Sequence, residues 1–150
     1  MSTYMQGALK SGSGFSEPLG TTAINASDIG YATFSKTATL QAATAATVDS
    51  TIVLPAGAQI IAIYVDSSVA WTATGAVTFT AGITAGGTEY ITSIDLKTVV
   101  RGAPTLTAAQ VGAMANIGTN TNLVVRATTA SGSNNTGTTL VTVLFVPKAL

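Results

Sequence analysis

The stretch from Thr51 to Asp66, TIVLPAGAQIIAIYVD, combines the densest apolar sequence of the chain with a marked turn. Thr51–Leu54 is β-branched and apolar, Pro55–Gly57 interrupts it, and Gln59–Val65 continues with almost no polar member. β-Branched residues favour strands, whereas proline and glycine favour turns. The stretch therefore predicts a strand, a turn and a second strand, around which the rest of the chain is organised.

The second of these strands is apolar on both of its faces. Because side chains alternate between the faces of a strand, one face is predicted to carry Ile61, Ile63 and Val65. A strand with two apolar faces is normally covered on both. In a chain of 150 residues, one cover is the domain's own core and the other can be a neighbouring subunit. We therefore expect Ile61, Ile63 and Val65 to form an oligomer interface. The opposite face then holds Ile60, Ala62 and Tyr64.

The composition favours one domain that associates with other proteins. A length of 150 residues suits a single domain with its own core. Only 8% of the residues are charged, against about 25% in an ordinary soluble domain. Six Lys and Arg balance six Asp and Glu, so the net charge is zero. Such a chain lacks the self-repulsion that keeps proteins apart and has no basic patch for nucleic acid, so association with protein is favoured.

Two absent residue types exclude much of enzyme chemistry. The chain contains no Cys and no His, which removes disulfides, thiolate nucleophiles, Ser-His-Asp triads and nearly all zinc sites. We therefore expect no cofactor. The N-terminal sequence lacks the apolar core of a signal peptide, and no apolar run approaches the roughly 18 residues of a membrane span. The expected place of synthesis is a cytoplasm, with no membrane contact.

Short strands separated by turn residues dominate the middle and end of the chain. Val77–Ile83 alternates with threonine, and Leu140–Val146 is apolar on both faces, which predicts a position beside Gln59–Val65 at a sheet centre. About seven strands favour an all-β, antiparallel β-sandwich, jelly-roll-like or Ig-like, with one short helix. The predicted strands are 31–40, 51–54, 59–65, 77–84, 88–97, 122–129 and 138–146, and the helix is 105–114, with a threonine N-cap and contacts from Val111 and Met114.

The first 30 residues differ from the rest of the chain. They show neither helical nor strand periodicity, and Ser11–Gly14 is typical of a linker. We therefore divide the chain into an N-terminal arm, 1–30, and a β-sandwich domain, 31–150. A disordered tail and a binding arm both fit this composition. The apolar anchors of a binding arm would be Phe15, Leu19, Ile24 and Ile29.

Few residues are candidates for chemistry or ligand binding. Paired carboxylates can hydrolyse glycosides, but nothing in the sequence brings the acids together, and ion pairs or solvated strand ends are the simpler interpretation. Trp71 with Tyr64 or Tyr90 could form a platform on which a sugar stacks. With 6% aromatic residues this signal is weak, and a core or interface role for Trp71 is favoured. The acids in question are Asp49, Asp66, Glu89 and Asp95.

Four phrases occur in an order that resembles a known family: PAGAQIIAIYVD, ITAGGTEYITSIDLKT, APTLTAAQVGAMANIGTN and TTLVTVLFVP. Over roughly residues 36–146 the chain is similar to the head decoration, or cement, proteins of tailed bacteriophages. The resemblance implies a β-sandwich that follows an N-terminal arm. It also implies a homo-oligomer, commonly a trimer, that binds the major capsid protein on the outside of the virion.

The resemblance and the composition lead to one expected function and two alternatives. We expect a structural, non-enzymatic protein, made in the host bacterial cytoplasm, that stabilises a capsid surface. Its interface residues would be Ile61, Ile63 and Val65, and its capsid-contacting residues would lie in the arm at Phe15, Leu19, Ile24 and Ile29. The main alternative is a carbohydrate-binding β-sandwich module, free or displayed on a virion. A hydrolase that uses only carboxylates is the third.

Overall fold

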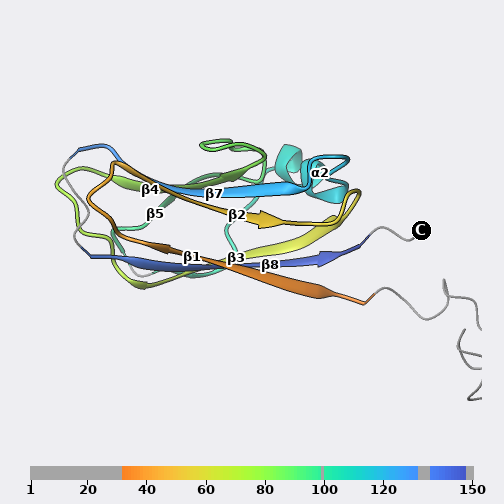
Figure 1. Ribbon diagram of the computed structural model, residues 1–150, viewed down its shortest axis with the longest axis horizontal. Helices are drawn as coiled ribbons and strands as arrows, with labels where there is room; N and C mark the ends of the chain where they lie inside the picture. The colour runs from red at the N-terminus through yellow and green to blue at the C-terminus, as the bar shows by residue number, and fades with distance from the viewer. Residues whose placement is uncertain (1–31, 99, 132–135, 148–150) are drawn as a thin grey trace, which may run out of the picture. The chain divides into compact units, whose positions relative to one another are not determined.

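The computed structural model describes residues 32–98, 100–131 and 136–147, and its sandwich unit begins at Thr33 (Figure 1). The described part of the chain is mostly strand, with one short helix and no helix long and apolar enough to cross a membrane. The elements are β1 (Phe34–Gln41), β2 (Thr47–Val53), β3 (Gln59–Val69), β4 (Val77–Gly82), β5 (Ile91–Asp95), β6 (Val100–Gly102), α2 (Ala108–Ala115), β7 (Asn122–Thr129) and β8 (Thr138–Val146).

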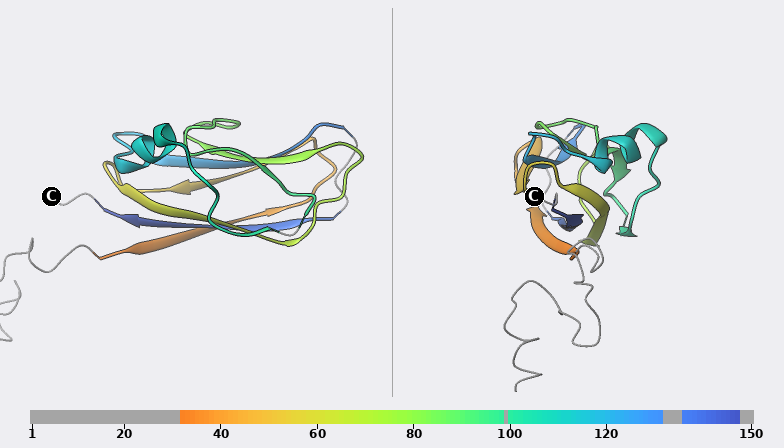
Figure 2. Two further views of the ribbon diagram at one scale, coloured as in Figure 1. Left: turned by 180° about the vertical axis from the view of Figure 1, so that it is seen from behind. Right: turned by 90° about the vertical axis from the view of Figure 1, so that its right-hand side faces the viewer.

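The strands form two antiparallel sheets of four, stacked face to face (Figures 1 and 2). Their orders are β1-β8-β3-β6 and β2-β7-β4-β5. The pairs β1 with β8, β2 with β7, β3 with β6 and β4 with β5 join the first half of the chain to the second half in reverse order. This nesting is the jelly-roll arrangement. The all-β sandwich is confirmed, and of its two expected forms the strand order is that of the jelly roll.

The turn in the central stretch connects the two sheets. β2 lies in one sheet and β3 in the other, so these two strands are neighbours in sequence without pairing. Gly57 takes a left-handed backbone, with φ of 73°, and its N–H donates to the carbonyl of Gly118 over 2.7 Å. A residue with a Cβ is strained in that region of backbone space. Thr51–Asp66 is thus a strand–turn–strand arch that spans the sandwich.

β3 and β8 lie side by side in the middle of their sheet, as predicted. Their pairing slips between Ile60 and Ala62, where β3 carries one extra residue. Such a bulge reverses the alternation beyond it. The prediction that Ile61, Ile63 and Val65 share one outward face is therefore wrong: Ile63 and Val65 are buried, whereas Ile61 is half exposed at the bulge. The inward residues of β3 are Ile60, Ile63, Val65 and Ser67.

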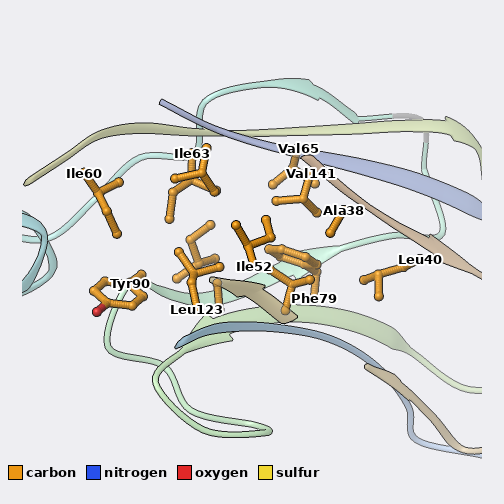
Figure 3. Packing of buried hydrophobic residues seen from close by; sticks show 14 of the residues in the cluster. Ala38, Leu40, Ile52, Ile60, Ile63, Val65, Phe79, Tyr90, Leu123 and Val141 are labelled. Carbon is orange, nitrogen blue, oxygen red and sulfur yellow. The ribbon is translucent and has the colours of Figure 1, made fainter. Parts of the chain in front are cut away.

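The core lies between the two sheets (Figure 3). Ile60, Ile63 and Val65 point from β3 toward Ile52 and Phe79 on the opposite sheet, and all are buried. In β4 the apolar residues Val77, Phe79 and Ala81 are buried while the threonines between them are partly exposed, as the alternation predicts. Each fully buried large apolar side chain stabilises the fold by roughly 1.5–3 kcal/mol.

Helix α2 follows the predicted threonine N-cap. The Thr107 hydroxyl accepts from the Gln110 backbone N–H over 3.3 Å, and the Gln110 side chain accepts from the Thr107 N–H over 2.8 Å. This reciprocal pair is a capping box. Met114 is buried as expected, but Val111 is 55% exposed, so the expected core contact of Val111 is wrong. Gln110 takes the buried position because its amide also donates to Thr92 Oγ1 over 2.9 Å.

Candidate assembly surface

The outward-facing side of sheet β1-β8-β3-β6, called here the outer face, carries large apolar side chains in register. Thr37, Thr142 and Tyr64 form the middle row across β1, β8 and β3. Diagonal neighbours on one face of a sheet lie about 7–8 Å apart, so Tyr64 is within reach of two leucines of β8. The row on one side is Ser35, Leu144 and Ala62, and the row on the other is Thr39, Leu140, Asp66 and Arg101.

This outer face is exposed and almost uncharged. Tyr64 is 41% exposed and Leu140 is 40% exposed, while Leu144 is partly exposed between them. Among the described residues of these rows only Asp66 and Arg101 carry charge, and they pair with each other at 3.0 Å. The face therefore has no net charge, and threonine and serine hydroxyls supply its remaining polarity. Burying Tyr64 and Leu140 against another protein would release water from apolar surface without stranding a charge.

The outward side of the other sheet is different in character. Its central row is Asp49, Arg126 and Thr80, and the first two form a two-point ion pair at 2.6 and 2.7 Å. Hydrogen bonding from Arg126 lowers the pKa of Asp49, against the opposing effect of burial, and raises that of Arg126. The hairpin glycine Gly86 lies beside the Arg126 guanidinium. The charges of this ion pair and the hairpin beside it make this side less suited to binding another protein through apolar contacts.

The structure separates the three predicted interface residues. Ile63 and Val65 belong to the core and are unavailable to a second subunit. Ile61 is exposed, so a role for it at an interface stays a prediction. Tyr64 was missed as an interface candidate because the bulge, which inverts the alternation along β3, is invisible in the sequence. Leu140 was missed because both faces of β8 are apolar, so its sequence does not say which face points outward.

The aromatic residues do not form the platform that a sugar would need. Trp71 and Tyr90 are 1% and 2% exposed, so neither offers a free ring face. The Trp71 indole donates to Thr139 Oγ1 over 2.8 Å, which satisfies its polar atom inside the core. Burial, with a smaller effect of the Glu89 charge, raises the pKa of Tyr90. The core role favoured for Trp71 is confirmed, and Tyr64 is the exposed member of the three.

The candidate acids are separate from one another. Asp66 pairs with Arg101 and Asp49 with Arg126. Glu89 accepts from the Ile83 N–H over 3.1 Å, and Asp95 accepts from the Lys97 N–H over 2.9 Å. Within the described ranges no three acids gather into a possible metal site. Each acid is therefore engaged locally, in a hairpin, a turn or a cross-strand pair.

The four predicted arm anchors lie outside the described residues; they are Phe15, Leu19, Ile24 and Ile29.

Comparison with known proteins leaves the family open. No protein-family model, no curated protein and no solved structure matches this chain. The resemblance to phage decoration proteins therefore stays a prediction that rests on the sequence phrases that carry it.

Proposed function

We propose that this chain is a structural virion protein that decorates and stabilises the outer surface of a bacteriophage capsid. It would bind the major capsid protein and copies of itself, commonly as a trimer, and have no catalytic role. The host bacterial cytoplasm would be its place of synthesis. The choice of a capsid as partner comes from the resemblance to decoration proteins.

The observation that carries the proposal is the neutral outer face around Tyr64 and Leu140. Contiguous exposed apolar side chains on a sheet face mark protein interaction sites more often than scattered ones do. Jelly rolls occur both in viral capsid proteins and in lectins, so the fold by itself does not choose between a capsid and a carbohydrate partner. The burial of Trp71 and Tyr90 weighs against the carbohydrate alternative, and the local engagement of the acids weighs against a hydrolase.

Cosedimentation with capsids tests the proposal. Capsids of the phage that encodes the chain, prepared without it, would be mixed with purified protein and pelleted. Wild-type protein should pellet at a saturating, fixed ratio to the capsid protein. The double variant Tyr64→Glu with Leu140→Glu should stay folded, because both side chains are exposed. It should bind the capsid at least tenfold more weakly, a loss of about 1.4 kcal/mol of binding free energy or more, because two new charges would be buried at the contact.

Thr47→Glu supplies the matched control. Thr47 is an exposed β2 residue on the outward side of the other sheet, so the same substitution there should leave binding unchanged. Failure of the wild-type protein to pellet would contradict the proposed function. Equal weakening by the control variant would show that the outer face is not the contact.

A further inference from the structure

A second apolar surface lies at the end of the sandwich where β3 begins. A groove of about 300 Å³ separates the start of β3 from helix α2. We name it the β3–α2 groove. Two of its lining side chains, Ile61 and Val111, are 49% and 55% exposed. The other lining residues include Gln59, Ile60, Leu106 and Met114, and none of the lining residues is charged.

The bulge in β3 helps to build this groove. Because Ile61 is the extra residue of the bulge, its side chain leaves the core side and lines the groove instead. Val111 lines the groove from α2, one turn before Met114, and stays exposed where Met114 is buried. Large apolar side chains left open in this way favour an apolar occupant.

The edge of β3 beside the groove also offers backbone groups. β6 pairs only with Val65, Asp66 and Ser67. Within the described part of the chain, Gln59–Tyr64 therefore has β8 on one side and no strand on the other (Figure 2). Such an edge can accept an extended segment by strand addition, in which the backbone supplies affinity and the adjacent pocket supplies specificity.

The chain's own N-terminal residues have the composition that this groove requires. Pro18–Ile29, PLGTTAINASDI, carries a single charged residue, Asp28, and holds the apolar Leu19, Ile24 and Ile29. Leu19 lies 13 residues before Ala32, the first described residue, and an extended chain of that length spans at most roughly 45 Å, which is enough to reach a neighbouring molecule.

The start of β1, close to where the described chain begins, lies near the β3–α2 groove. Phe34, at the start of β1, is level with Phe145, which is level with Ile60 at the groove. The start of β1 is thus about two strand spacings, roughly 10 Å, from β3. However, β8 lies between β1 and β3, and the chain leaves β8 through Pro147 at this same end (Figure 1). The start of β1 is therefore separated from its own groove by β8, whereas a groove on a second copy has no such strand in front of it by necessity.

We propose that the stretch Pro18–Ile29 of one copy docks in the β3–α2 groove of a second copy. Leu19 or Ile24 would fill the groove between Ile61 and Val111, while the segment's backbone pairs along Gln59–Tyr64. Each copy both gives a segment and offers a groove, so the contact is head to tail and closes into a ring when the rotation between copies allows it. The inference goes beyond the proposed function, because it concerns contacts between copies in the absence of any capsid.

Cysteine cross-linking tests this directly, since the natural chain has no cysteine. Three donor proteins carry Leu19→Cys, Ile24→Cys or Ile29→Cys, and the acceptor carries Val111→Cys. Each donor would be mixed with the acceptor under mild oxidation and followed on non-reducing gels. At least one donor should form a disulfide-linked heterodimer about tenfold faster than with a control acceptor, because docking raises the local thiol concentration.

The control acceptor is Thr74→Cys, an exposed residue in the loop beyond the far end of β3. Equal rates with both acceptors, or no heterodimer with any donor, would overturn the inference. A chain that carries both Ile24→Cys and Val111→Cys adds a second decision. It should form links between chains, and exclusively intrachain links would also overturn the inference. None of these results depends on capsid binding, so the two proposals can fail separately.

Discussion

Gly137, just before β8, lies against the ring of Trp71. A Cβ added to Gly137 would lie 2.5 Å from Trp71 Cγ, and its φ of 146° is a conformation that side chains rarely adopt. We predict that Gly137→Ala lowers the free energy of unfolding by about 1–3 kcal/mol or more, through overpacking and strain. Urea unfolding measures this.

Gly112 provides the matched control for the same substitution. It lies inside helix α2, and an added Cβ would meet nothing within 4 Å. Gly112→Ala should raise the free energy of unfolding by up to about 1 kcal/mol, because alanine loses less backbone entropy in a helix. If Gly137→Ala left stability unchanged or raised it, the packing of Trp71 against Gly137 would be wrong.

The ion pair between Asp49 and Arg126 gives a pH-dependent prediction. The hydrogen bonds from Arg126 lower the Asp49 pKa below its ordinary value of 3.8. A lowered folded-state pKa contributes stability above the unfolded value, and this is lost as the pH falls through the folded value. Because both side chains are partly exposed, Asp49→Asn should cost only about 0.2–1 kcal/mol at pH 7.

The pH series supplies the check on that assignment. The difference in unfolding free energy between wild type and Asp49→Asn should be constant at neutral pH. It should shrink as the pH falls below 3.8, where the wild-type carboxylate also becomes neutral. A difference that grows on acidification would contradict the lowered pKa.

At the scale of elements, the bulge in β3 determines which isoleucines are structural. Ile63 is buried, so Ile63→Asp would place an unpaired carboxylate in the core, cost several kcal/mol and prevent folding or cause aggregation. Ile61 is half exposed, so Ile61→Asp should yield folded protein and cost far less stability than Ile63→Asp. Circular dichroism and urea unfolding compare the two. Equal damage would mean that the bulge is misplaced.

The same bulge shows where sequence-based prediction stops. Strand periodicity correctly predicts the buried positions of β4 and the neighbouring positions of β3 and β8, because these follow from local alternation and two-sided burial. A one-residue bulge leaves no recognisable residue pattern in the sequence, so the residues of β3 that point outward could not be predicted. Trp71 was ambiguous for a similar reason, since its pocket is made by Thr139 and Gly137, far away in the sequence.

At the scale of the whole molecule, the strand order also depends on contacts between distant segments. Nothing within β1 specifies β8 as its partner, so jelly-roll and Ig-like arrangements fit the pattern equally until the pairs are seen. The nested pairs bring the start of β1 and the end of β8 to one end of the sandwich, beside the β3–α2 groove (Figure 1). The outer face and this groove give each copy two apolar surfaces suited to neighbours.

We therefore predict a stable homo-oligomer in the absence of capsids, and the resemblance to decoration proteins implies a trimer. Multi-angle light scattering at micromolar concentration should give three times the mass of the chain. Exposed apolar side chains on two surfaces and zero net charge both favour association. A monodisperse monomer under these conditions would contradict the prediction.

Electron cryomicroscopy of virus particles from cells that produce the chain would show whether the chain binds the outer surface of a capsid. Copies of the jelly roll should lie on the outside of the capsid, with Tyr64 and Leu140 buried against neighbouring protein. Particles that lack the chain, or copies in which that outer face points to solvent throughout, would contradict it.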